Sequence, residues 1–511
     1  MDVESGRITA MTCEGVYRGI RSRGVDCYLG LRYGQIPGRF LPAVAPHPHD
    51  GVQDAIAFGP HAPQTEGKVN ATGEWADTLE YMYPRTGSCL EGGPMDEDCL
   101  YLNVWAPADP PEPVPVLVWL HGGGCMLGTG AEALFNGANL ARTGRAAVVT
   151  LNHRLGLLGF LDLERELGGE YARSGSVGIY DIVQALRWVR DNIAAFGGDP
   201  GNVTVAGQSG GGTKVAALLG MPEAQGLFHK AVNQSSGYPA SVPQAVAQDR
   251  AAAALSRWGI SAEELLELDW TRVIELQESL PEAFDWFGPN CHPQFYPASA
   301  FEPGSRPLSK VPVLLGTTMH EMSLMLIQTP GYRQVADCDV PGWLERSGVS
   351  EPVSCFAAYR AQYPTEPAAL LLARIETERS FGLSAALAAD HLASLGHEVY
   401  KYYLAFPTDA MGGALGACHS LCLPLAFGNA AFSPFAGSNP AKVSVSKAMS
   451  TAWLDFVCEG VPRLPSGEAW PRYDATGSQA RIDELWSVMP APDPQAALPL
   501  AAGPMWANGY R

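Results

Sequence analysis

The chain has 511 residues, 46% of them hydrophobic and 17% charged, which is enough to bury a large core and excludes an extensively disordered protein. Lys and Arg number 34 and Asp and Glu number 53, giving a formal net charge of −19. This acidic balance argues against nucleic acid or an anionic membrane as the main partner.

The first hundred residues contain short strand-like runs, such as 15–19 and 25–31, that are broken by Gly and Pro. Two apolar, β-branched runs follow at 114–120 and 146–151, and their composition is typical of strands buried on both faces. Residues 180–196 have the apolar spacing of a helix, which two glycines then end.

Further buried strands are predicted at 202–206 and 311–315. Strands that alternate with helices predict an α/β protein with a large, mostly parallel central sheet and helices on both faces. Between residues 240 and 410 the pattern becomes mostly helical, for example at 370–393. We interpret this part as helical cap insertions in a single domain spanning 1–511, because no linker-like stretch separates two cores.

The first residues are acidic and lack the apolar run of a secretion signal, and no apolar stretch approaches the ~20 residues that span a bilayer. The eleven cysteines are an odd number and are scattered along the chain. These features predict a cytoplasmic protein with reduced thiols and no membrane partner. Cys418 and Cys422 flank His419, but no second Cys/His pair stands nearby, so no metal site is expected.

The sharpest local motif is G-Q-S-G-G at positions 207–211, between a predicted strand and a helix-forming run that starts at Lys214. A serine in G-x-S-x-G at a strand-to-helix turn is the nucleophile elbow, where only small neighbours permit the tight backbone. Ser209 would then lie at a helix N-terminus, where free amides and the helix dipole favour a developing negative charge. Because G-x-S-x-G is also common by chance, a second motif is needed.

That second motif is H-G-G-G at 121–124, directly after the first predicted buried strand. The backbone amides of Gly123 and Gly124, together with that of Gly210, are predicted to form an oxyanion hole for a tetrahedral intermediate. The alternative is a glycine-rich turn or a phosphate loop, but no G-K-[ST] follows. His121 itself is interpreted as a structural hydrogen-bonding residue.

The run E-D-C-L-Y-L-N-V-W at 97–105 resembles the signature of the type-B carboxylesterase family, which includes the cholinesterases. The resemblance covers nearly the whole chain, including N-H-R-L-G at 152–156 and A-W-L-D-F at 452–456. It implies the α/β-hydrolase fold and an enzyme of the bacterial branch that cleaves esters through an acyl-enzyme.

In this fold the catalytic groups follow in the order serine, acid, histidine. The segment G-T-T-M-H-E at 316–321 resembles the one that carries the triad acid, which maps to Glu321. The segment G-A-C-H resembles the one that carries the base, which maps to His419. His419 would take the Ser209 proton while Glu321 orients the imidazole, because a free hydroxyl is a weak nucleophile. No metal or organic cofactor is expected.

The resemblance also implies supporting residues. Ser235 matches a serine that hydrogen-bonds near the triad acid, and His320 is interpreted as solvent-facing or as a neighbour of the site. Two ion pairs, interpreted as structural, are implied between Arg39 and Glu97 and between Arg154 and Asp181.

The chain departs from the family pattern at several positions. Gln208 stands where Glu is usual, Gly210 where Ala is usual, and Cys422 where an acid is often found. Neither elbow change removes a backbone donor, so the oxyanion hole is expected to survive. The usual cysteine partner of Cys99 is missing, which leaves Cys89 as the near candidate for a short disulfide and fits a cytosolic enzyme.

Specificity is less well defined by the sequence. Residues 86–90 contain no aromatic side chain to receive a quaternary ammonium, so a choline-ester specialist is not expected. Trp286, Phe287, Phe295 and Tyr296 form an aromatic cluster that either lines an acyl pocket or packs in the core.

The leading hypothesis is a serine carboxylic-ester hydrolase whose partner is a small to medium ester. A hydrolase or acyltransferase dedicated to one natural-product ester, lactone or carbamate would use the same triad. A non-catalytic adhesion protein on this fold is disfavoured, because both Ser209 and His419 are present. The acyl group, the alcohol group and the oligomeric state are not predicted.

Overall fold

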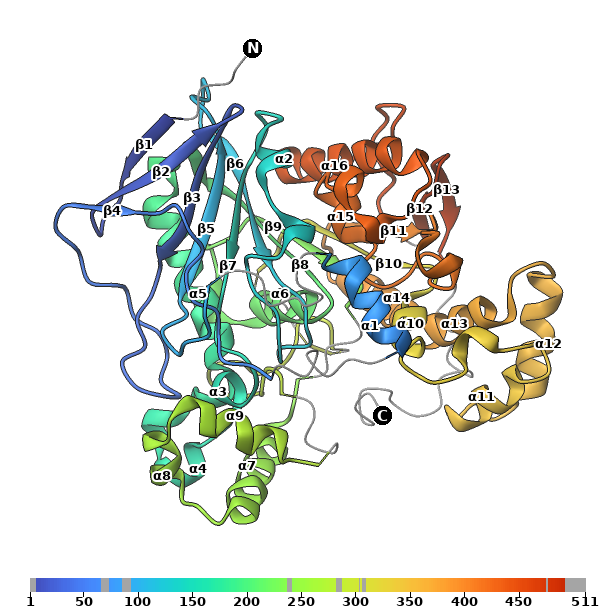
Figure 1. The fold of residues 1–511 in the computed structure, drawn as a ribbon, viewed down its shortest axis with the longest axis horizontal. Helices are drawn as coiled ribbons and strands as arrows, with labels where there is room; N and C mark the ends of the chain where they lie inside the picture. Colours follow the sequence, from blue (N-terminus) through green and yellow to red (C-terminus); the bar gives the residue numbers. More distant parts are fainter. Residues whose placement is uncertain are drawn as a thin grey trace.

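The computed structural model describes residues 6–65, 73–84, 93–236, 241–281, 287–302, 304–305, 309–474 and 477–491. One 13-stranded sheet runs through these residues, in the order β1-β2-β3-β5-β7-β6-β8-β9-β10-β11-β12-β13, with β4 paired to β2. The strands from β7 to β12 in this order are parallel, and antiparallel strands extend the sheet at both ends. Figure 1 shows the sheet twisting through the molecule with helices packed along it.

The strands are β1 (Gly6–Met11), β2 (Val16–Ser22), β3 (Val25–Arg32), β4 (Val52–Asp54), β5 (Tyr101–Pro107), β6 (Val114–Leu120), β7 (Ala147–Leu151), β8 (Gly198–Gln208), β9 (Lys230–Gln234), β10 (Val313–Thr318), β11 (Val399–Leu404), β12 (Ser478–Ile482) and β13 (Ser487–Pro490). The helices are α1 (Gly73–Met82), α2 (Ala138–Ala141), α3 (Gly156–Phe160), α4 (Glu164–Leu167), α5 (Val177–Asn192), α6 (Gly210–Gly220), α7 (Gln244–Trp258), α8 (Ala262–Glu267), α9 (Trp270–Glu278), α10 (Glu321–Leu326), α11 (Val340–Arg346), α12 (Pro352–Gln362), α13 (Ala368–Thr377), α14 (Leu383–Ser394), α15 (Cys422–Ala426) and α16 (Ala441–Glu459).

The central strands are buried on both faces, as their apolar composition predicts. Alternate residues of β6 belong to two different hydrophobic clusters, with Val116 and Val118 on one face and Leu117 and Trp119 on the other. Helices α5, α6 and α14 pack against the first face, and α2, α15 and α16 pack against the second. The layered arrangement therefore follows directly from the period-two pattern of the strands.

The strand predicted at 114–120 has the bounds of β6, and the one predicted at 146–151 begins one residue later, as β7. The strand predicted at 202–206 lies within β8, which begins four residues earlier and ends two residues later. The strand predicted at 311–315 begins two residues later, as β10. The predicted helix 180–196 is α5 followed by a 3₁₀ turn at Ile193–Phe196, which Gly197 ends with a φ of 78°.

The mostly helical part between 240 and 410 consists of two separate groups, α7–α9 and α10–α14. Strand β10 lies between them, and β11 follows the second group, so both strands belong to the central sheet. Figure 1 shows the first group at the lower left and α11–α13 at the right of the molecule. Among the described residues, no helix is both long and apolar enough to cross a bilayer.

Candidate active site

The residues predicted to be catalytic follow the carboxyl ends of parallel strands, which meet at one edge of the sheet. Ser209 follows β8, Glu321 begins α10 shortly after β10, and the H-G-G-G loop with the predicted oxyanion donors follows β6. His419 lies in the segment between β11 and α15. The sheet order β6-β8-β9-β10-β11 places these strand ends side by side.

Ser209 joins β8 to α6 with φ of 57° and ψ of −125°, a conformation that costs a non-glycine residue about 1–3 kcal/mol. Its glycine neighbours make this turn possible. A Cβ at Gly207 would lie 2.4 Å from the Gly211 carbonyl, and one at Gly211 would lie 2.1 Å from the Leu120 oxygen. Ser209 is half-buried, so the turn presents the hydroxyl at a position that solvent reaches.

The glycine-rich loop after β6 packs directly against this elbow. Gly123 and Gly124 have φ of 82° and 62°, the left-handed region that glycine adopts without strain. An added Cβ at Gly210 would lie only 2.5 Å from the Gly124 nitrogen. None of the backbone amides of Gly123, Gly124 and Gly210 donates a hydrogen bond to the part of the chain that the structure describes. The three predicted oxyanion-hole donors thus lie on adjoining segments, and none has a hydrogen-bond acceptor among the described residues.

The acid and the base form a short, buried hydrogen bond. His419 Nδ1 lies 2.6 Å from Glu321 Oε2, and both side chains are almost fully buried. The other carboxylate oxygen of Glu321 accepts the backbone N–H of Thr318 at 2.6 Å. Because Nδ1 faces the carboxylate, the proton of a neutral imidazole is held there and the lone pair is left on Nε2.

The imidazole of His419 is contacted by a residue other than the serine. The side-chain nitrogen of Gln208 lies 3.0 Å from Nε2 and 3.5 Å from Nδ1, so it packs against the ring rather than in line with the Nε2 lone pair. Gln208 Oε1 accepts from the hydroxyl of Ser420 at 3.4 Å. No hydrogen bond joins Ser209 to His419, although both residues are described. The sequence marks Gln208 as a departure from the family pattern but gives no sign of this contact.

The structure shows the surroundings of Ser235 and His320, the two residues that the sequence places near the triad acid. Ser235 is buried, has φ of 49°, and its hydroxyl has no hydrogen-bond partner among the described residues. His320 is buried and its Nε2 lies 2.6 Å from Glu366, so the solvent-facing interpretation is wrong. The sequence gives no sign of Glu366 as a partner, because it is 46 residues away.

Both predicted ion pairs are present. Arg39 makes two hydrogen bonds to Glu97, at 2.8 and 2.6 Å. Arg154 makes two to Asp181, also at 2.8 and 2.6 Å, and this pair is nearly inaccessible to solvent. Their positions confirm the structural role inferred from the sequence.

The cysteines beside His419 are buried thiols. Burial, followed by the charge of Glu321, raises the pKa of both Cys418 and Cys422. No group of His, Cys, Asp or Glu suited to a metal ion occurs in the described part of the chain. Cys99 is a free, buried cysteine, while Cys89 lies outside the described residues, as does the whole of 86–90.

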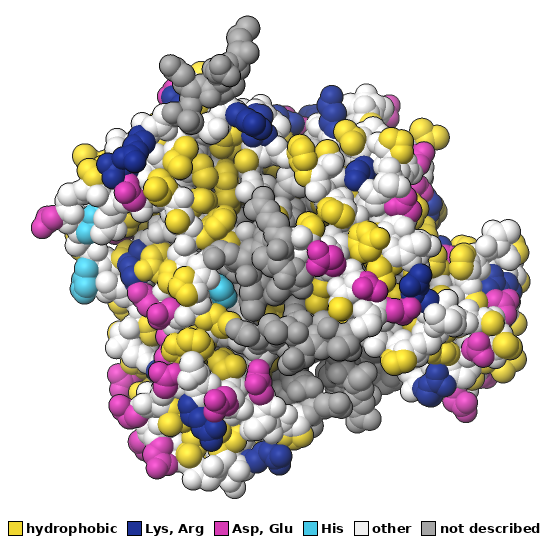
Figure 2. All heavy atoms as spheres, in the orientation of Figure 1, with side chains coloured by type: hydrophobic (Ala, Val, Ile, Leu, Met, Phe, Trp, Pro, Cys, Tyr) yellow, Lys and Arg dark blue, Asp and Glu magenta, His cyan; other side chains and the backbone are white. Residues whose placement is uncertain are grey.

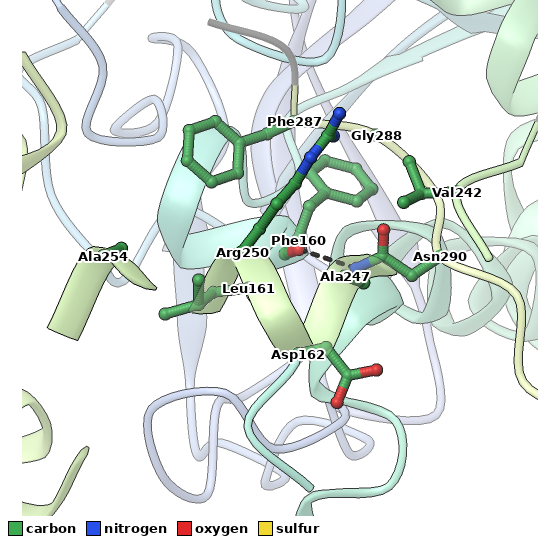
Figure 3. Close-up of a pocket in the computed structure, with 10 residues that line it drawn as sticks. All are labelled: Phe160, Leu161, Asp162, Val242, Ala247, Arg250, Ala254, Phe287, Gly288 and Asn290. Carbon is green, nitrogen blue, oxygen red and sulfur yellow. Dashed lines mark hydrogen bonds between the residues drawn. The ribbon is translucent and has the colours of Figure 1, made fainter. Parts of the chain in front are cut away.

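Two neighbouring cavities share Asp162 and Asn290; one lies beside α3 and α7 and the other beside the start of α5, and no triad residue lines either of them. The first has Phe160 and Phe287 at its wall, and Figure 3 shows the Arg250 side chain extending toward Phe287 and Gly288, with Asp162 on the opposite side of the labelled group. The second is lined by other members of the predicted aromatic cluster, Phe295 and Tyr296. Residue 286 lies outside the described residues.

A model of the carboxylesterase family matches residues 5–485. The chain belongs to this family. It is 39% identical to the para-nitrobenzyl esterase of Bacillus subtilis over 325 residues, which cover 60% of this chain and 61% of that protein. It is 32% identical to the phenmedipham hydrolase of Pseudarthrobacter oxydans over 491 residues, covering 92% and 93% of the two chains.

Solved structures of carboxylesterases superpose on nearly the whole chain. A carboxylesterase from Geobacillus stearothermophilus gives a TM-score of 0.79 at 32% identity, covering 96% of this chain and 99% of that one. An esterase from Clostridium hathewayi, described as able to hydrolyse aliphatic aromatic polyesters, gives 0.81 at 29% identity, covering 95% and 97%. The comparisons confirm the predicted α/β-hydrolase fold and a serine enzyme that hydrolyses carboxylic esters.

Proposed function

We propose that this carboxylesterase acts through a triad of Ser209, His419 and Glu321. The observation that carries the proposal is the 2.6 Å bond between His419 Nδ1 and Glu321 Oε2, beside a serine held in a strained elbow. A base whose second nitrogen is fixed by a buried carboxylate is what activation of a serine hydroxyl requires.

In the first half of the reaction, His419 Nε2 takes the proton of Ser209 as its oxygen attacks the ester carbonyl. The carbonyl oxygen becomes negative and is held by the amides of Gly123, Gly124 and Gly210. The imidazolium, stabilised by Glu321, then protonates the leaving alcohol. Water repeats the sequence on the acyl-enzyme, which releases the acid and restores the serine.

The proposed substrates are small to medium carboxylic esters. The half-buried serine and the names of the relatives, among them a para-nitrobenzyl esterase, support this class. A cytoplasmic location is also proposed, because every cysteine among the described residues is a free thiol, as a reducing compartment favours. Localisation of a fluorescent fusion of the full chain in cells would test it.

Replacement of the nucleophile tests the triad directly. Ser209→Ala should lower kcat for p-nitrophenyl butyrate by about 10⁴-fold, since the proton donor and the attacking oxygen are both lost. A fluorophosphonate should add once to the wild-type chain, and peptide mass spectrometry should place the adduct on Ser209. The control, Ser444→Ala, removes an exposed serine of α16 and should leave turnover and labelling unchanged.

The proposal is wrong if Ser209→Ala retains near-normal turnover, or if the adduct forms at another residue of a folded wild-type protein. Circular dichroism of each variant shows whether the fold is kept. Added methanol separates hydrolysis from acyl transfer, because an acyltransferase would yield the methyl ester as its main product.

A further inference from the structure

Lys214 is a fully buried lysine in the second turn of α6, close to the nucleophile that begins this helix. Its Nζ donates to the backbone carbonyl of His121 at 2.8 Å. No carboxylate in the described part of the chain forms an ion pair with it. A buried ammonium without an ion-pair partner is costly, so the position calls for an explanation.

Lys214 reaches this carbonyl because α6 approaches the end of β6 without side chains between them. A Cβ at Gly211 would lie 2.1 Å from the Leu120 oxygen and 3.0 Å from the His121 oxygen. Residues three and four apart share one face of a helix, so Lys214 lies above Gly210 and Gly211 on the same side. The lysine therefore meets the chain where β6 turns into the oxyanion loop, residues 121–125.

Alternate carbonyls of this loop, those of residues 121, 123 and 125, accept hydrogen bonds from other parts of the chain. The His121 oxygen accepts from Lys214, the Gly123 oxygen from two backbone amides at 2.9 and 3.1 Å, and the Cys125 oxygen from the Gly156 amide at 2.8 Å. A peptide unit is planar, so fixing a carbonyl fixes the N–H of the next residue in the opposite direction. Glycine alone would leave these amides free to rotate.

The titratable groups around Lys214 come from three segments. His121 and His153 stack with ring centres 4.9 Å apart, and burial, followed by the charge of Lys214, keeps the pKa of each imidazole well below its usual value. Burial raises the pKa of the Cys125 thiol. Glu132 is the acidic group whose charge acts on Lys214.

We propose that Lys214, in its charged form, is a positioning residue that holds the oxyanion loop and favours the negative charge formed there. The inference rests on the proposed triad mechanism and extends it. The ammonium anchors the His121 carbonyl and with it the peptide plane that ends in the Gly122 N–H, directly before the predicted donors of the loop. Its positive charge, buried below the loop, also lowers the energy of the oxyanion without touching it.

This role predicts a loss of activity in mildly alkaline solution. Burial lowers the pKa of Lys214 from 10.5 to about 8, against the opposing effects of Cys125 and Glu132. The ammonium is present below this pH and lost above it, so kcat/KM should fall as pH rises from about 7 to 9. The two imidazoles titrate below this range and the thiol above it.

The test compares pH profiles of kcat/KM for p-nitrophenyl butyrate between pH 6 and 9.5, corrected for spontaneous hydrolysis. Lys214→Met should be about 100-fold slower at pH 7 and should show no alkaline decline, because a displaced catalytic group costs about that much. Lys214→Gln keeps an uncharged donor for the His121 carbonyl. Its kcat/KM at pH 7 should therefore fall less than that of Lys214→Met, and its pH profile should likewise show no alkaline decline. Lys214→Arg stays charged throughout and should also lose the alkaline decline.

Lys401 on β11 offers a matched control, because it too is fully buried, with its pKa lowered by burial to about 8. Its Nζ donates to Gln479 at 2.6 Å, and its charge acts with Asp390 on α14. Lys401→Met should keep the alkaline decline of the wild type. The inference fails if the Lys214 variants keep that decline, or if Lys401→Met removes it.

If Lys214 only stabilises the fold, its variants should have lower kcat/KM but a pH profile of the same shape as that of the wild type. That result would also overturn the inference. If Lys214→Met does not fold, Lys214→Gln and Lys214→Arg decide the outcome. Fluorophosphonate labelling separates this failure from that of the triad. Adducts on Ser209 in every variant, with unchanged profiles, refute the role of Lys214 alone, whereas no adduct on the wild type refutes the triad.

Discussion

At the scale of single residues, the base is held by two neighbours of different character. Glu321 Oε2 lies 2.6 Å from Nδ1 of His419, while the Gln208 side-chain nitrogen lies beside the ring, 3.0 Å from Nε2 and 3.5 Å from Nδ1. The structure thus places a neutral amide against the imidazole, and no hydrogen bond between the described residues joins that ring to Ser209.

Replacing this amide with a carboxylate should change the pH dependence of the reaction. In Gln208→Glu, a negative group 3 Å or so from Nε2 favours the imidazolium, which cannot take the Ser209 proton. The acid limb of kcat/KM should therefore move to higher pH by about one unit, with activity recovering at alkaline pH. Steady-state kinetics from pH 5 to 9 on p-nitrophenyl butyrate measure the shift.

Gln53→Glu is the control for this prediction, because it adds the same charge at an exposed position on β4. Its profile should overlay that of the wild type. If the pH profile of kcat/KM for Gln208→Glu also overlays that of the wild type, residue 208 does not act on His419 in solution.

At the scale of secondary-structure elements, His320 connects the cap helices to the segment between β11 and α15 that carries His419, which we call the base loop. His320 accepts the Ala417 amide at Nδ1, at 3.1 Å, and its Nε2 lies 2.6 Å from Glu366. Arg374 on α13 makes two hydrogen bonds to the same carboxylate, at 2.8 and 3.0 Å. The group joins the start of α10, the helix α13 and the segment that carries His419.

Glu366→Gln should lower the free energy of unfolding by about 3 kcal/mol at pH 7, because it leaves the Arg374 cation buried without a carboxylate. Burial by itself raises the pKa of Glu366, but hydrogen bonds from His320 and Arg374 outweigh it and lower the pKa from 4.5 to about 2. The folded state therefore favours the carboxylate. Its contribution is complete above about pH 5 and is lost as pH falls from there toward 2.

Urea unfolding of wild type and Glu366→Gln at pH 7, 5 and 3.5 tests both statements. The difference between the two proteins should be equal at pH 7 and 5 and smaller at 3.5. Glu459 is the last residue of α16 and forms an exposed ion pair with Arg463. Glu459→Gln should change the free energy of unfolding little at any pH. A difference at pH 3.5 as large as that at pH 7 would contradict the assigned role of Glu366.

At the scale of the whole molecule, the sequence predicts what depends on short-range pattern. Strand β6, the elbow and the H-G-G-G loop are contiguous motifs, so the buried sheet and the serine position follow from residues within a few positions of one another. Strand β11 was missed because its period-two pattern contains the buried Lys401. A lysine in a short run lowers the apolar signal on which strand prediction depends.

The contacts around the catalytic groups join residues far apart in the chain, so short-range sequence pattern could not predict them. Gln208 and His419 are 211 residues apart, and their contact exists because the base loop packs over the elbow. Lys214 looks like an ordinary helix-forming residue in the sequence. Its burial follows from the approach of α6 to β6, which depends on which strands become neighbours in the sheet.

The net charge of −19 should also affect which esters the enzyme prefers. Figure 2 shows acidic side chains scattered on the viewed face, mainly at the lower left and toward the right. Their field extends about 30 Å at 0.01 M salt but only about 10 Å at 0.1 M. A neutral ester, p-nitrophenyl butyrate, should therefore have a higher kcat/KM than the anionic mono-p-nitrophenyl glutarate at low salt. The ratio should fall several-fold by 0.5 M salt, because screening removes long-range repulsion.

The control ratio, between the acetate and butyrate esters, involves no charge and should not change with salt. A preference for the anionic ester would mean that a local cation outweighs the total field. Arg250, at the cavity beside α7, makes no ion pair with another described residue and is the candidate for that effect. In that case Arg250→Gln should remove the preference for the anionic ester. If the net charge of the whole molecule acts instead, the ratio of kcat/KM for the neutral ester to that for the anionic ester should be close to the wild-type ratio in this variant.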